Sequence, residues 1–128
     1  MSKIYLNLGI IATQQEDYEK AVYLHEKCIE NKLAYIGENS DEVMNSYVLL
    51  AHNYMKNEDY LGNISYLEKA LQICRTINGD YTETTAYSMV QVADAYQAAE
   101  DYSKAINSLE HGGMILSKLE HQKHSITG

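Results

Sequence analysis

The sequence contains no phenylalanine, no tryptophan and no proline among its 128 residues. Its twelve tyrosines must therefore supply all of the large aromatic packing. A buried tyrosine ring brings a hydroxyl with it, and that hydroxyl needs a hydrogen-bond partner. We therefore expect the core to contain tyrosines with identifiable polar partners.

Cysteine and long apolar runs are also scarce. The two cysteines, Cys28 and Cys74, form no Cys-x-x-Cys motif, which favours buried free thiols in a reducing compartment. No apolar run approaches the roughly 18 residues of a membrane span. Residues 1–6 could pass for a weak signal peptide, but Asn7 interrupts them. We expect a cytoplasmic protein without membrane insertion.

Basic residues are few: ten lysines and arginines face 18 acidic residues, and the net charge is −8. This balance argues against a nucleic-acid backbone or an anionic membrane surface as the main partner. The length suits one domain with a modest core.

Sequence motifs for catalysis are missing as well. There is no glycine-rich phosphate loop and no Gly-x-Ser-x-Gly elbow. His25 and Cys28 share one face of a predicted helix, and His111, His121 and His124 lie near the C-terminus. A metal site needs three or four convergent ligands, and no second half is visible. We predict no enzyme activity, no metal site and no cofactor.

A tripeptide recurs at regular intervals along the sequence. Glu-Asp-Tyr occurs at residues 16–18, 58–60 and 100–102, so each copy lies 42 residues after the last. Nine residues before each aspartate, an apolar residue precedes a very small one: Leu8-Gly9, Leu50-Ala51 and Val92-Ala93. A fixed period of this size indicates a repeat array. Acidic pairs repeated at predicted helix starts are interpreted as helix caps rather than as paired catalytic carboxylates.

The repeat resembles the tetratricopeptide repeat (TPR), whose signature is W-x2-L-G-x2-Y, then A-x3-F, then P. The matching segments are Tyr5-x2-Leu8-Gly9-x2-Ala12, Tyr47-x2-Leu50-Ala51-x2-Tyr54 and Met89-x2-Val92-Ala93-x2-Tyr96. The departures are that Asn63 replaces an expected alanine, His25 takes an aromatic slot, and no copy has the proline. The period of 42, against about 34 for the common TPR, is similar to that of the kinesin-light-chain type.

The resemblance implies an all-α, TPR-like α-solenoid, a right-handed superhelix of three helix-turn-helix units. The single domain would hold repeats at about 1–40, 41–82 and 83–120, with a tail at 121–128. The sequence predicts helices over about 3–14, 18–35, 41–56, 60–77, 82–98 and 102–120. Asp17, Asp59 and Asp101 would cap the second helix of each unit, and Ser40 or Asp41 the third helix of the chain.

Glycines raise separate expectations. Gly62 should cause either fraying or a close helix contact. Gly112 shares a small slot with Cys28 and Ala70, so close packing explains it, whereas the pattern offers no reason for Gly113. The packing face of the first helix is predicted to be Tyr5, Leu8, Gly9 and Ala12.

Stacked units place their first helices along a concave groove. The residues expected to face it are Lys3, Leu6, Ile10, Asn45, Val48, His52, Met55, Tyr87, Val90, Asp94 and Gln97, with Thr13 beside them. Such a groove would suit an amphipathic helix or an extended peptide with apolar anchors. The alternative is that these residues pack on another helix of this chain or of a longer parent.

The C-terminal end of the stack is a second candidate surface. After the sixth helix nothing remains to cover Leu109, Ile115, Leu116 and Leu119. A bare apolar face of this size usually marks an interface. Self-association, docking into a large assembly and truncation of a longer solenoid all fit.

The predicted function is a non-enzymatic protein–protein interaction module or scaffold subunit that binds a protein segment in its groove or docks through its ends. The alternative is a cargo or regulatory peptide adaptor resembling kinesin light chain. The carboxylate clamp of TPR co-chaperones is missing, because its positions hold Leu6, Ile10, Leu49, Tyr87 and Gln91. Of the asparagines that kinesin-light-chain repeats favour on this helix, Asn7 alone matches.

Overall fold

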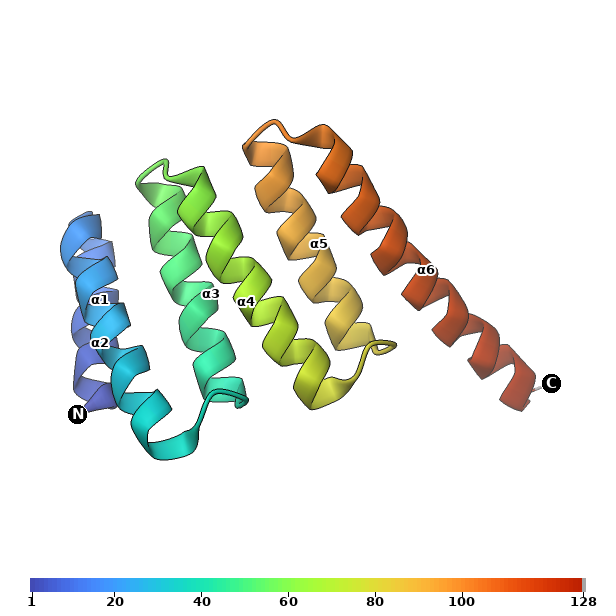
Figure 1. Cartoon of the computed structure of the whole chain (residues 1–128), viewed down its shortest axis with the longest axis horizontal. Coiled ribbons are helices and arrows are strands. Elements are labelled where there is room, and N and C mark those ends of the chain that lie inside the picture. Colours follow the sequence, from blue (N-terminus) through green and yellow to red (C-terminus); the bar gives the residue numbers. More distant parts are fainter. Residues whose placement is uncertain (128) are drawn as a thin grey trace.

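The chain is a row of six helices in a computed structural model, which describes the backbone of residues 1–127 and the side chains of residues 1–123. No strand occurs within residues 1–127. The helices are α1 Ser2–Gln14, α2 Tyr18–Ile36, α3 Asp41–Lys56, α4 Tyr60–Asn78, α5 Glu83–Ala98 and α6 Tyr102–Thr127. Figure 1 shows them side by side in chain order, with α1 and α2 at one end and α6 at the other.

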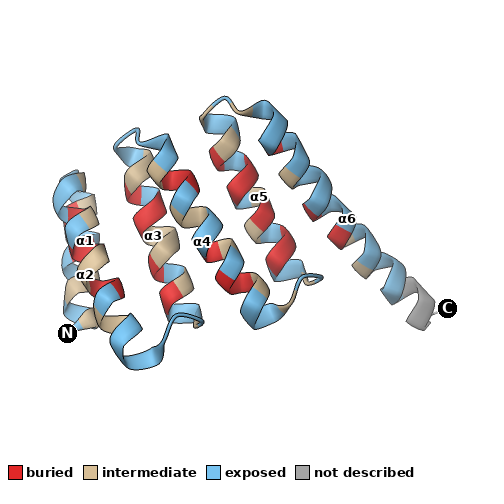
Figure 2. Ribbon diagram, viewed as in Figure 1, coloured by how far each residue is buried: buried red, intermediate tan, exposed pale blue. Residues whose placement is uncertain are grey.

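Neighbouring helices pack as antiparallel hairpins that then stack. The hairpins are α1–α2, α3–α4 and α5–α6, and they join through contacts of α2 with α3 and of α4 with α5. Buried positions lie along the facing sides of the middle helices (Figure 2). The predicted all-α, TPR-like solenoid is confirmed.

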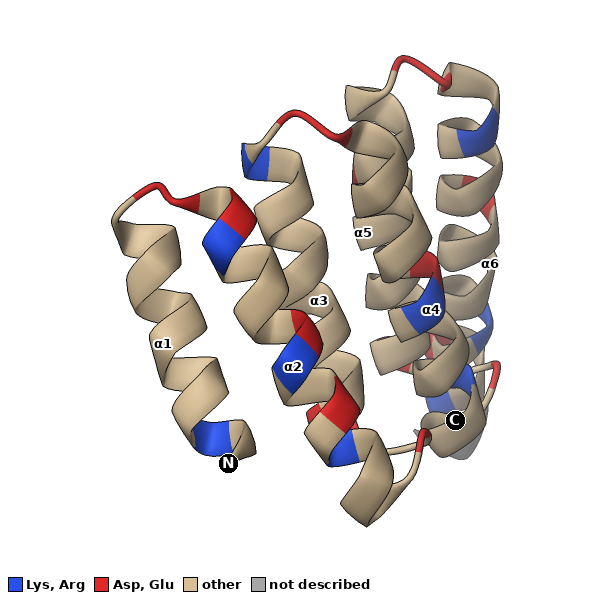
Figure 3. Ribbon diagram, turned by 60° about the vertical axis from the view of Figure 1, so that its left-hand side comes forward, with Lys and Arg blue, Asp and Glu red and all other residues tan. Residues whose placement is uncertain are grey.

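One aspartate caps the start of the second helix in each hairpin, as predicted. The carboxylates of Asp17, Asp59 and Asp101 accept hydrogen bonds from the backbone N–H three residues further on, at 3.3, 3.0 and 3.3 Å. These bonds satisfy donors that a helix start otherwise leaves free, and the negative charge suits the helix dipole. The three acidic turns lie at the same end of the stack (Figure 3).

Each of these turns also holds a glutamate in the left-handed backbone conformation. The φ angles of Glu16, Glu58 and Glu100 are 62°, 59° and 63°. The next N–H donates to the carbonyl five residues back, as from Asp59 to Tyr54 at 2.8 Å, which is the Schellman arrangement of a helix end. Glycine normally occupies this position, because a Cβ strains the left-handed conformation.

The loops at the opposite end use glycine at the helix end and a hydroxyl at the next helix start. Gly37 and Gly79 have φ angles of 81° and 97°. Ser40 caps α3, accepting from the Val43 N–H at 3.2 Å, and Thr82 caps α5. Of the two predicted caps for α3, the structure therefore selects Ser40. Thr82 precedes α5 rather than beginning it.

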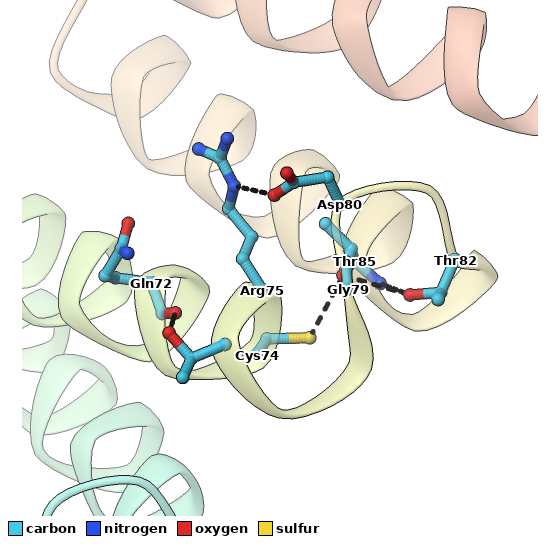
Figure 4. Close-up of polar contacts among 8 residues, drawn as sticks. Gln72, Cys74, Arg75, Gly79, Asp80, Thr82 and Thr85 are labelled. Carbon is cyan, nitrogen blue, oxygen red and sulfur yellow. Dashed lines mark hydrogen bonds and ion pairs between the residues drawn. The ribbon is translucent and has the colours of Figure 1, made fainter.

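The α4–α5 loop carries an additional polar network (Figure 4). The Thr85 hydroxyl donates to the Gly79 carbonyl at 2.7 Å and lies 3.6 Å from the Cys74 thiol. Nearby, Arg75 Nε donates to Asp80 at 2.8 Å. The end of α4 and the start of α5 are therefore linked by side chains as well as by the chain.

Small residues set the closest helix contacts. A Cβ at Gly112 would lie 3.3 Å from the Ala86 carbonyl oxygen, so close packing explains this glycine, as predicted. A Cβ at Gly62 would lie 2.6 Å from the Tyr54 ring, so this glycine marks a close contact rather than fraying. Gly113 has open space around it.

Two expectations for the ends of the chain are wrong. The sixth helix was expected to end near Glu120, but α6 continues to Thr127. Leu8 was expected on the packing face of α1, but it is 45% exposed, whereas Gly9 and Ala12 are buried. The equivalent Leu50 and Val92 are buried, because an earlier hairpin covers them.

Candidate protein-binding groove

Two adjoining hollows lie between α3 and α5. The first has a volume of about 260 Å³ and is lined by Val48, His52, Met55, Asn63, Leu67, Gln91, Asp94 and Ala95. The second, of about 310 Å³, is lined by Met44, Asn45, Val48, Ala70, Thr84, Tyr87, Ser88 and Gln91. Val48 and Gln91 belong to both hollows. We call the combined surface the α3–α5 groove.

The groove contains part of the set predicted from sequence. Predicted residues that line it are Asn45, Val48, His52 and Met55 from α3, and Tyr87 and Asp94 from α5. Lys3, Leu6, Ile10, Val90 and Gln97 line neither hollow. Gln91 lines both hollows but was absent from the predicted binding set, although the resemblance to TPR co-chaperones had marked its position as part of the groove. Thr13 holds α1 to α3 instead, because its hydroxyl lies 2.8 Å from Asn53 Oδ1.

The groove combines apolar and polar side chains. Val48 and Met55 are half-buried apolar side chains of α3, and His52 and Asp94 are exposed polar ones. A bound segment would therefore meet an apolar strip with a carboxylate and an imidazole beside it. The anionic Asp94 makes this surface more suitable for neutral or basic segments than for acidic ones.

One buried polar group borders the groove. Asn63 stands where the other two units have Ala21 and Ala105, and its side chain is buried. Its Nδ2 donates to the Ala51 carbonyl at 2.7 Å, while within the described part of the chain its Oδ1 has no hydrogen-bond partner. This residue joins the wall of the groove to the backbone of α3.

Three tyrosines on α3 and α4 form a cluster at the surface that the sequence analysis did not predict. The Tyr66 ring stacks on Tyr47 and Tyr54, at centroid distances of 5.7 and 5.4 Å, and Lys69 Nζ lies 4.8 Å from its centre. The Tyr54 hydroxyl donates to Glu26 at 3.4 Å. Burial, followed by nearby Tyr66 and Glu26, raises the pKa of Tyr54 to about 12. The expected hydroxyl partner of a packed tyrosine is thus present here.

Another such pair joins the second and third hairpins. The Tyr96 hydroxyl donates to Glu68 on α4. Burial, and then this hydrogen bond, raises the pKa of Tyr96 to about 12. Glu26 and Glu68 lie 42 residues apart, as do Tyr54 and Tyr96, so the pair is a repeated contact between hairpins.

The C-terminal surface differs from the predicted one. Ile115 is fully buried in a cluster with Ala86 and Met89, so the expectation that it lies uncovered is wrong. Leu116 and Leu119 are half-buried against that cluster, and Leu109 remains 47% exposed. A hollow of about 630 Å³ opens beside them, lined by Tyr81, Thr82, Glu83, Leu116, Leu119, Glu120, Gln122 and Lys123.

The residues considered for metal binding have other surroundings. His25 and Cys28 are both buried, and a Cβ on Gly9 would lie 3.0 Å from the His25 ring. Burial, and then the charge of Lys32, lowers the pKa of His25. Among the described residues, no three His, Cys, Asp or Glu side chains form a metal-binding group, and the side chain of His124 lies outside those residues. None of the helices within residues 1–127 combines the length and apolar character needed to cross a membrane.

Two segments of the sequence match models of a known repeat family. One sequence model of the tetratricopeptide repeat matches residues 42–112, more than half of the chain, and a second matches residues 3–30. Among curated proteins, none is similar to this chain in sequence.

Solved structures are similar in fold. BtubC (BKLC) from P. vanneervenii has a TM-score of 0.79 and 22% identity over 93% of this chain and 48% of its own. The TPR-like repeats of a putative kinesin light chain from Podosopora anserina give 0.72 and 21%, over 91% of this chain and 56% of theirs. The N-terminal domain of stress-induced protein-1 from C. elegans gives 0.67 and 21%, over 95% and 94%. The chain thus spans about half the length of the first two.

Proposed function

Because the chain belongs to the tetratricopeptide repeat family, whose members generally mediate protein–protein interaction, we propose that it is a non-enzymatic interaction module that binds a protein segment in the α3–α5 groove. The observation that carries this proposal is the pair of adjoining hollows that share Val48 and Gln91. Together they extend along the facing sides of α3 and α5, as a linear ligand requires.

The lining of the groove favours a particular kind of ligand. Val48 and Met55 offer apolar contacts to alternate or helically spaced side chains of a peptide, while His52, Gln91 and Asp94 offer polar ones. The charge of Asp94, and the net charge of −8, favour a neutral or basic segment. The carboxylate clamp positions lack lysine and arginine, so an acidic C-terminal tail is a poor ligand.

The test is selection of ligands from a random peptide library, followed by affinity measurements on variants. Val48→Glu places a charge at one of the two residues that both hollows share, and it should weaken binding of the selected peptides by at least about tenfold, or about 1.4 kcal/mol. Leu61→Glu is the matched control, since Leu61 is 81% exposed on α4 and lines neither hollow. Peptides that bind Val48→Glu as tightly as the original chain would exclude the groove.

A cargo or regulatory peptide adaptor is the second candidate. The 42-residue period and the fold similarity to the repeats of a putative kinesin light chain favour it. An adaptor exchanges short peptides, whereas a scaffold subunit keeps one partner. Dissociation of the selected peptides within seconds would favour the adaptor, and retention over hours would favour the scaffold.

A further inference from the structure

An apolar stripe runs along the outer side of α1, and none of the helices within residues 1–127 covers it. Met1, Ile4, Leu8 and Ile11 follow one another at intervals of three, four and three residues, which places them on one helical face. They are between 45% and 71% exposed. We call this set the α1 stripe.

The same repeat positions are covered in the other two hairpins. On α3 the equivalents are Val43, Ser46, Leu50 and Asn53, all at most 2% exposed. On α5 they are Thr85, Ser88, Val92 and Ala95, and all except the half-buried Ser88 are buried. The covering element is the helix before, α2 or α4. The α1 stripe therefore occupies the repeat positions that, on α3 and α5, form one half of the interface between hairpins.

The counterpart of the other half lies on α6, where it is largely exposed. Ile106, Leu109, Gly113 and Leu116 on α6 occupy the repeat positions of Ile64, Leu67, Leu71 and Cys74 on α4, the helix that packs on α5. Ile106 and Leu109 are exposed, whereas the equivalent Ile64 is buried and Leu67 is half-buried. Leu116 is half-buried where Cys74 is buried. We call this set the α6 stripe. In Figure 1 the two stripes belong to the helices at the two ends of the row.

The stripes differ from the internal interfaces in compensating ways. Ile4 and Ile11 replace the smaller Ser46 and Asn53, so α1 carries extra bulk. Gly113 replaces Ile29 and Leu71, so α6 carries less bulk at this position, and the space around Gly113 is open. An isolated glycine inside a helix destabilises it, and packing within the chain gives no reason for this one. A bulkier partner helix would supply that reason.

One polar contact between hairpins is replaced by apolar residues on both α6 and α1. Between the first two hairpins, Lys32 Nζ donates to the Ser46 hydroxyl at 2.9 Å. The repeat positions of these two residues at the ends hold Leu116 and Ile4. A polar pair inside the chain thus becomes an apolar pair where the ends would meet. Ala12 stands where Tyr54 donates to Glu26, so an end-to-end junction lacks that hydrogen bond and relies on apolar contact.

From this continuity we propose that the α1 stripe binds the α6 stripe of a second copy of the chain, which extends the stack head to tail. The contact is heterologous, so it does not close on itself and can add further copies. This self-association is separate from peptide binding in the α3–α5 groove. Each can fail without the other.

The test is sedimentation velocity of the full chain from micromolar to millimolar concentration, with two blocking variants. Gly113→Glu places a charge in open space on the α6 stripe, and it should not destabilise the monomer because it removes a helix glycine. Ile4→Glu blocks the α1 stripe at a position where the other hairpins have serine. The matched controls are Gly113→Ala and Ile10→Glu, the latter being off the stripe on the same helix.

We expect the original chain to form dimers and longer species as concentration rises, and each blocking variant to stay monomeric with unchanged helicity by circular dichroism. An equal mixture of the two variants should form a one-to-one dimer and grow no further, since each supplies the face that the other lacks. A monomeric original chain at millimolar concentration would overturn the proposal. So would loss of association in Ile4→Glu alone, which indicates a symmetric α1–α1 contact, or a mixture that stays monomeric.

Discussion

Replacing Glu58 by glycine is expected to stabilise the chain, because the backbone there is left-handed with a φ of 59°. A side chain in this conformation costs about 1–2 kcal/mol. Glycine removes that strain, but it loses more freedom on folding, which takes back about 0.5–1 kcal/mol. When the lower ends or the upper ends of the two ranges are taken together, the net gain is about 0.5–1 kcal/mol.

Thermal unfolding followed by circular dichroism can measure this gain. At about 2.1 cal/mol/K per residue, unfolding of a 128-residue chain has an entropy of about 270 cal/mol/K, so 1 kcal/mol raises the Tm by about 4 °C. The expected rise for Glu58→Gly is about 2–4 °C. Glu16 and Glu100 occupy the same turn in the other hairpins, so glycine at all three should add up to about 1.5–3 kcal/mol.

Glu58→Ala is the necessary control. Both variants remove a negative charge from a helix C-terminus, where the helix dipole disfavours it. Alanine keeps the Cβ that causes the backbone strain, so the difference between the glycine and alanine variants is the strain less the extra freedom that glycine loses on folding. A glycine variant no more stable than the alanine variant would refute the assignment of strain to this turn.

Three further changes probe the core. The pKa of His25 is lowered in the folded chain, so as pH falls below about 6.5 a proton binds the unfolded chain before it binds the folded one. The free energy of unfolding, measured by urea denaturation, should therefore be full above this pH and decline below it. His25→Phe should flatten the decline below this pH. Gly62→Ala should destabilise the chain by about 1–3 kcal/mol despite its better helix propensity, because its Cβ would lie 2.6 Å from the stacked Tyr54 ring; a higher Tm would contradict this contact. Ala70→Leu should cost roughly 1–3 kcal/mol by overpacking the buried middle of α4, and an unchanged thermal midpoint would argue against the register of that helix.

The repeat period predicts most of the fold because the same short-range interactions, such as helix caps, recur in each of the three hairpins. Capping by Asp17, Asp59 and Asp101 depends on residues within one turn of each helix start, and the structure confirms all three. The packing of Gly112 also follows from its repeat position, since the small slot faces the partner helix of the same hairpin. The left-handed glutamates were not predicted, because glutamate gives no sequence signal for that conformation.

The ends and the groove were predicted less well because they depend on what lies beside the helix. Leu8 has the same repeat position as Leu50, but no earlier hairpin covers it. Ile115 faces α5 and is buried, although it lies in the helix at the open end. The hollows between α3 and α5 include Gln91 rather than Val90, and that choice depends on the rotation of α5 against α3, which the period does not determine.

The network around Thr85 joins the second and third hairpins through side chains as well as through the loop. Bending between these hairpins must stretch the contacts of Thr85 with Gly79 and Cys74. At the same level between the first and second hairpins, Val43 replaces Thr85, and Lys32 replaces Cys74 and donates instead to the Ser46 hydroxyl and the Glu42 carbonyl. At the start of the chain, α1 has no side-chain hydrogen bond at its N-cap and no acidic residue in its first turn. Under a pulling force we therefore expect α1 to separate from the other helices first.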